Sequence, residues 1–256
     1  MTQLSPITGN YIVGKGLLYF KELGSTKFEE LGDIDGFSLQ QEVERLERFS
    51  NQYAVRTKTD SRINQQNYTA SMQLFQLNAR NRAMGLLSDV DYLTQTGATN
   101  PTEVISGVVT GGIYKLSAYN ITLLSLKDGA AADYVADTNY ELDVETGLLS
   151  IILPPGSNYA VHAFYSKAAI VAADGRLNAG IGSSPNLEGA LLFRGVNTVG
   201  RAVEVMLHKC RIAPSGERQY ISDEYSSIQI EAEILADSTQ AAGFDIGWER
   251  DLNTTA

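Results

Sequence analysis

The stretch YELDVETGLLSIIL, residues 140–153, decides the fold class. Tyr140 and Leu142 alternate with acidic residues, which is the two-residue period of a strand with one buried face. Thr146 and Gly147 supply the chemistry of a tight turn, and the apolar run that follows them has the character of a returning strand. This hairpin predicts a mainly β protein.

The same alternation occurs along the chain on both sides of the hairpin. The strand expected near the N-terminus has apolar residues on both faces, which is typical of a strand covered on both sides, and its glycines mark a bend or a close backbone approach. One short helix is expected after Asn78, which can cap it, because Ala79, Ala83, Leu86 and Leu87 would then share one face. Further strands are expected at residues 11–20, 70–74, 159–165, 203–208 and 228–234.

The segment GFSLQQEVERLERFSNQ, residues 36–52, fits two structures. Leu39, Val43 and Leu46 recur at helical spacing among good helix formers, and local propensity therefore favours a helix. Apolar residues also alternate from Phe37, as in a strand. A polar, basic stretch at about 45–66 follows, and we predict a long hairpin loop there, either a solvated tip or an arm that reaches an acidic surface of a neighbouring copy.

Composition limits the classes of function. The 256 residues carry a net charge of −10 and a pI near 4.7, which argues against a protein that grips nucleic acid through neutralised phosphates. A single cysteine excludes an intramolecular disulfide framework. We see no signal peptide, and the longest apolar run, at 148–153, is too short to cross a bilayer, so we expect a soluble protein made in a cytoplasm. After a turn-rich linker from Thr94, residues 97–166 are expected to form a β insertion within a discontinuous domain, 1–96 and 167–256.

Candidate catalytic motifs all have simpler explanations. Residues 9–15 match the start of a phosphate-binding loop, but no buried strand precedes them, no helix start follows, and Gly16 has no hydroxyl for a metal. His162 and His208 lie in alternating strands without ligand spacing, and Cys210 is expected to fill the core. We therefore expect no enzyme activity, no cofactor and no metal site.

The order of these pieces resembles the major tail tube proteins of long-tailed bacteriophages. The early strand GKGLLYF is followed by LGDIDGFSLQQEVERLERFSNQYAVRTKTDSRI and YTASMQLFQLNARNRAMGLL, and the chain ends with LEGALLFRGVNTVGRAVEVMLHKCRIAPSGERQYI and SIQIEAEILAD. The middle β segment is similar to a small insertion found in many members. The resemblance covers nearly the whole chain, and it implies that residues 37–49 form a strand and not a helix.

The resemblance implies a structural virion protein. Its fold would be a β-sandwich of two antiparallel sheets with one short flanking helix, a long hairpin loop and a small β insertion, 97–166, on the tube exterior. Six copies would form a ring, and rings would stack into the hollow tail tube that conducts viral DNA during ejection. An acidic lumen would repel phosphates and let DNA slide. The inter-ring contact residues would be Arg48, Phe49, Asn51, Tyr53, Arg56, Lys58 and Arg62.

Implied partners are other copies of the chain, the tail tip or initiator, the tape measure and the tail terminator proteins, and DNA that passes without specific binding; no membrane is implied. The implied location is the tail of a virion, of the non-contractile type, assembled in the cytoplasm of a bacterial host. Two alternatives stay open. The chain could be a tube subunit of a contractile tail or of a secretion injection machine, or a non-enzymatic carbohydrate- or cell-binding β-sandwich module of the tail.

Overall fold

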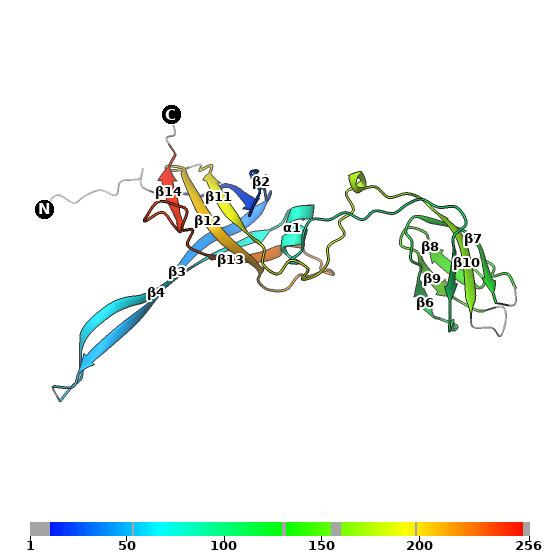
Figure 1. The fold of residues 1–256 in the computed structure, drawn as a ribbon, viewed down its shortest axis with the longest axis horizontal. Helices are drawn as coiled ribbons and strands as arrows, with labels where there is room; N and C mark the ends of the chain where they lie inside the picture. Colours follow the sequence, from blue (N-terminus) through cyan, green and yellow to red (C-terminus); the bar gives the residue numbers. More distant parts are fainter. Residues whose placement is uncertain (1–10, 53, 130–131, 155–159, 198, 253–256) are drawn as a thin grey trace. The chain divides into compact units, whose positions relative to one another are not determined.

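A computed structural model describes residues 11–52, 54–129, 132–154, 160–197 and 199–252 (Figure 1). The described part is mainly β, with antiparallel sheets and one short α-helix, which confirms the predicted fold class at this level. The chain divides into two compact units, one made of Met1–Val90 with Ala179–Ala256 and the other of Asp91–Asn178. No helix within the described residues has the length and apolar character needed to cross a membrane.

The first unit contains one eight-stranded antiparallel sheet. Its strand order is β2-β1-β11-β12-β13-β4-β3, with β14 also paired to β12. The expectation of two separate sheets is wrong because the long β12 pairs with β14 through its first half and with β13 through its second half, so that one sheet includes them all. The strands are β1 (Gly16–Glu22), β2 (Glu29–Glu30), β3 (Ile34–Ser50), β4 (Thr57–Leu74), β11 (Glu188–Gly195), β12 (Val203–Pro214), β13 (Ile228–Ile234) and β14 (Gly247–Asp251).

This sheet curls to enclose a core. Phe37 at the start of β3 stacks on Phe193 of β11, with ring centroids 5.3 Å apart, although three strands separate β3 from β11 in the sheet. Strand β13 alternates buried and exposed positions along its whole length, as its sequence predicts, and Ile230 is fully buried. Burial of apolar side chains from both ends of the strand order stabilises the curl.

The N-terminal strand is shorter than expected. Strand β1 begins at Gly16, not at residue 11, and Tyr11 and Ile12 are exposed. The expected close approach is confirmed at Gly16, where an added Cβ would lie 2.5 Å from the ring of Phe193. A glycine at this position therefore lets an aromatic side chain cover the strand.

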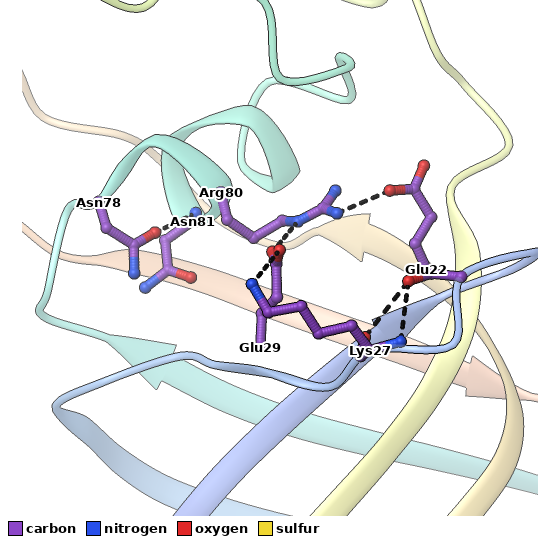
Figure 2. A network of polar contacts seen from close by, with 7 residues as sticks. Glu22, Lys27, Glu29, Asn78, Arg80 and Asn81 are labelled. Atoms are coloured by element: carbon purple, nitrogen blue, oxygen red, sulfur yellow. Dashed lines mark hydrogen bonds and ion pairs between the residues drawn. The ribbon is translucent and has the colours of Figure 1, made fainter. Parts of the chain in front are cut away.

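The helix α1 (Ala79–Met84) begins where the sequence predicts it, and its N-cap is Asn78, whose Oδ1 accepts a 2.8 Å hydrogen bond from the Asn81 N–H. It is shorter than expected, because it ends before Gly85, and Leu86 and Leu87 lie beyond it. Arg80 fixes the helix to the sheet through ion pairs with Glu22 (2.7 Å) and Glu29 (3.1 Å) (Figure 2). Partial burial disfavours the charge of Arg80, but the hydrogen bonds and charges of the two glutamates outweigh this and raise its pKa.

The second unit contains two three-stranded antiparallel sheets, β5-β10-β7 and β6-β9-β8, around a core of its own. The predicted hairpin is confirmed as β8 and β9, and Gly147 in its turn has a φ of +70°, a conformation that glycine adopts readily. The strand expected from Tyr159 begins at Val161; Tyr159 itself lies outside the described residues. The strands are β5 (Thr102–Ile105), β6 (Ile113–Lys115), β7 (Ile121–Asp128), β8 (Tyr140–Asp143), β9 (Leu148–Ile151) and β10 (Val161–Lys167).

Candidate assembly surface

Strands β3 and β4 form a long two-stranded ribbon. Their antiparallel register runs from Ile34 opposite Leu74 to Ser50 opposite Thr57. Strand β13 covers β4 only over Tyr68–Leu74, so within the described structure residues 57–67 pair with β3 alone. Figure 1 shows this pair of strands projecting from the sheet of its unit. We call residues 39–67 the ribbon.

The ribbon corrects two expectations from sequence. Residues 36–50 are strand, as the resemblance implies, and the helix favoured by local propensity is wrong because pairing with β4 decides the conformation. The long loop predicted at about 45–66 is also wrong, since strand pairing continues to Ser50 and Thr57. The connection between the strands is therefore short, and the arm is an ordered β structure instead of a loop.

Large apolar side chains are exposed along the ribbon. A two-stranded ribbon has no opposing layer to cover its faces, and isolated two-stranded hairpins are only marginally stable in water. Several large apolar side chains exposed along one projecting element make it a candidate interaction site. The exposed fractions are 51% for Leu39, 68% for Leu46, 42% for Phe49, 74% for Val55 and 50% for Ile63.

The end of the ribbon where β3 and β4 are joined, which we call the tip, is basic. Lys58 forms an ion pair with Glu47 across the two strands, and Arg62 forms one with Asp60 at 3.1 Å. Arg48 and Arg56 form no ion pair with any residue that the structure describes. Two cationic side chains at the tip are thus available for an acidic partner.

The structure brings most of the predicted contact residues together at the tip. Phe49 lies opposite Lys58 in the register, and the Arg56 guanidinium lies 5.8 Å from the Phe49 ring centroid, within the range of a cation–π interaction. Of the others, Arg48 lies at the end of β3, Asn51 in the connection and Arg62 further along β4. Tyr53 lies outside the described residues.

Sequence reasoning missed the apolar members of this surface. Local pattern places Leu39 and Leu46 on a helix face and Ile63 in a polar loop, whereas the strand pairing leaves all three exposed on the ribbon. A signal was present, because apolar residues recur within a stretch otherwise rich in Glu, Arg and Gln.

The ribbon also has unpaired strand edges. Strand β3 ends the strand order of its sheet, so the outer edge of its 17 residues has no neighbour among the described strands. The opposite edge of residues 57–67 has none either. Backbone N–H and C=O groups along such edges are templates for pairing with a strand of another chain. Two free edges and exposed apolar side chains give the ribbon the properties of an interface.

Residues considered for catalysis lie in structural positions. Cys210 is fully buried, and burial raises the pKa of its thiol to about 12, so that it stays protonated and unreactive. His162 and His208 lie within β10 and β12. Within the described ranges, no group of three or more His, Cys, Asp or Glu side chains is placed to hold a metal ion.

Comparison with protein-family models gives a match to the family described as "Protein of unknown function UCP028589" over residues 11–248. The matched region includes the ribbon, the helix, the whole second unit and most of the first. A search of curated proteins gives no match.

Proposed function

The chain belongs to the family UCP028589, whose model covers most of it, and from the geometry of its ribbon we propose that it is the tail tube subunit of a long-tailed, non-contractile bacteriophage. In this proposal the curled eight-stranded sheet of the first unit forms the wall of the tube. Six copies form a ring, and the rings stack into the hollow tube through which the viral genome is ejected. The protein is structural, acts without a cofactor, and resides in the virion tail after assembly in the bacterial cytoplasm.

The observation that carries this proposal is the ribbon. In the isolated subunit the ribbon has open strand edges and exposed apolar residues. Both features favour aggregation in a protein that works alone. A repeated, symmetric contact with other copies would cover them, since the same surfaces recur on each subunit. A tube subunit needs such a surface for side-by-side and ring-to-ring contacts.

The charge supports a conduit and not a nucleic-acid binder. The chain has 30 acidic and 20 basic residues, and a net negative surface attracts no phosphates. Viral DNA that moves through a tube must pass without lasting contacts, and a field of like charge serves this purpose. The insertion, Asp91–Asn178, has its own core and would sit outside the tube wall, where it leaves the channel clear.

Assembly would involve proteins besides the subunit itself. A tip or initiator complex would start the tube, a tape measure protein would set its length, and a terminator would close it. Contacts with these proteins need exposed surfaces of the subunit and no pocket for a small molecule.

Electron microscopy of the purified protein, together with light scattering, tests the proposal. We expect rings or hollow tubes with six-fold symmetry, either spontaneously or after addition of tail tip complexes. Removal of residues 52–63, which form most of the connection and the start of β4, should give folded subunits or single rings that do not stack. A uniform monomer that never polymerises at high concentration or with tip complexes contradicts the proposal, and glycan binding by that monomer would support the tail-module alternative.

A further inference from the structure

We infer that the ribbon tip of one copy docks head-to-tail on a second copy, with Arg48 and Arg56 entering an acidic, aromatic hollow formed by Phe75, Asp223, Glu224 and Tyr225. This inference rests on the proposed function and names the surface that receives the ribbon. The receiving surface is built around the connection between β12 and β13, residues 215–227, which we call the acceptor loop.

The acceptor loop exposes side chains that a free-standing protein usually covers. Tyr220 is 73% exposed, Ile221 97% and Tyr225 94%. Hydrogen bonds within the loop hold it in shape, for example from the Glu224 N–H to the Ser222 Oγ at 3.0 Å. An ordered loop with exposed aromatic and aliphatic residues is typical of a contact surface, because tyrosines supply large contact areas with little loss of conformational entropy.

The hollow beside the loop has the chemistry that binds a guanidinium group. It is lined by Phe75, Asp223, Glu224 and Tyr225. Carboxylates accept charge-assisted hydrogen bonds from arginine, and an aromatic face attracts its cation. Asp223 and Glu224 form no ion pair among the described residues, so both carboxylates are available.

The ribbon tip offers the matching groups. Arg48 and Arg56 also lack ion pairs in the described structure, and Phe49 and Val55 add exposed apolar surface beside them. Basic and apolar residues at the tip thus correspond to acidic and aromatic residues at the acceptor loop. Complementary charge of this kind fixes the orientation and register of a contact.

The two surfaces lie at opposite ends of the same strand, which excludes a contact within one copy. Strand β4 begins at Thr57 beside the tip, and its last residue, Leu74, pairs with Ile228, which directly follows the acceptor loop. At about 3.3 Å per residue, the 18 residues of β4 span about 56 Å. A surface at one end and its complement at the other make a heterologous contact that repeats along an axis. The axial repeat of the assembly should therefore not exceed about 60 Å.

Cysteine cross-linking tests the contact directly. The double variant N51C/S222C places one thiol at each end, and the native Cys210 is buried and unreactive, so it leaves no background. Under assembly conditions a short bis-maleimide should convert the double variant into a ladder of covalent multimers. The single variants N51C and S222C should give little product alone and only dimers when mixed. Efficient dimer formation by either single variant alone, or no ladder from the double variant, would overturn the head-to-tail contact.

A charge exchange supplies the second test. R48E/R56E and D223R/E224R should each raise the protein concentration needed for tube growth by about tenfold, and the four substitutions combined should restore growth. The control K127E/R176E, in the other unit, should have no effect. Normal tubes from R48E/R56E, or no recovery in the combined variant, would refute the inference while wild-type tubes uphold the proposed function. A covalent ladder without rings or tubes in the wild type would refute the proposed function and uphold the contact.

Discussion

The apolar side chains of the ribbon give the sharpest test of its role in assembly. We consider the variant L46T/F49T/I63T, which removes three exposed apolar residues and keeps the strand propensity of β-branched threonine. In the free subunit these side chains are 68%, 42% and 50% exposed, so much of their surface remains in water. The substitution should therefore change the free energy of unfolding of the monomer by no more than about 1 kcal/mol.

The effect on assembly should be much larger. Complete burial of a Leu, Ile or Phe side chain contributes about 1.5–3 kcal/mol, and roughly half of that remains to be gained at these three positions when a second copy covers them. Loss of about 2.5–4 kcal/mol per contact weakens association by about 100- to 1,000-fold, since 1.4 kcal/mol corresponds to a factor of ten. The critical concentration for tube growth should rise by that factor.

Sedimentation of polymer at a series of protein concentrations measures this change, with circular dichroism to check folding. The matched control V104T/I113T/V135T removes three apolar residues of the second unit that are 52%, 70% and 58% exposed, and it should assemble as the wild type does. If the ribbon variant keeps the wild-type critical concentration, or if both variants lose assembly equally, the ribbon is not the interface that its exposure indicates.

Three further predictions concern the subunit itself. R80M should lower the free energy of unfolding by about 1–2 kcal/mol in urea titrations, because it removes two partly exposed ion pairs that hold α1 to the sheet; an unchanged midpoint would contradict this anchoring role. Arg211, through its hydrogen bond, and Lys209 lower the pKa of Glu188, so this group contributes stability above its unfolded pKa of about 4.3 that is lost as the pH falls. Urea titrations at pH 3 and pH 6 should accordingly show a smaller difference in the free energy of unfolding between the two pH values for E188Q than for the wild type. Equal differences for the two proteins would disprove the assignment. Replacement of residues 92–177 by a short glycine linker should leave a folded first unit that still assembles, since Tyr92 and Leu177 are already bridged, whereas unfolding would show that the insertion supports the core.

The sequence predicted those elements in which local pattern and final environment agree. Strand β13 alternates apolar and polar residues because one face meets the core and the other meets water, and the period alone reveals this. Helix α1 was predicted from a cap that acts within its own first turn, where Asn78 satisfies a backbone N–H of the helix. Both signals depend on interactions between residues that are close in the sequence, so a short window that contains those residues is enough to detect them.

The ribbon could not be predicted in this way, because its conformation depends on a partner strand. Leu39, Val43 and Leu46 fit a helix face when taken alone, and only the register with β4 makes them strand residues. The same holds for the two ends of the proposed contact. Nothing in a local window relates Arg56 to Tyr225, and their relation appears only when β4 is seen to separate the tip from the acceptor loop.

The ribbon has open edges and exposed apolar residues, which an isolated protein usually avoids, but charged residues limit their effect. Its apolar residues are interleaved with charges such as Glu47 and Lys58, which pair across the strands and oppose unspecific edge-to-edge association. A free subunit can therefore remain soluble although its edges are open, and association requires a surface that matches both the charge and the apolar pattern. Local features that disagree with a stable monomer while agreeing with one another are typical of a functional surface, and this agreement is the reason that we propose ordered growth on an existing end as the role of the ribbon.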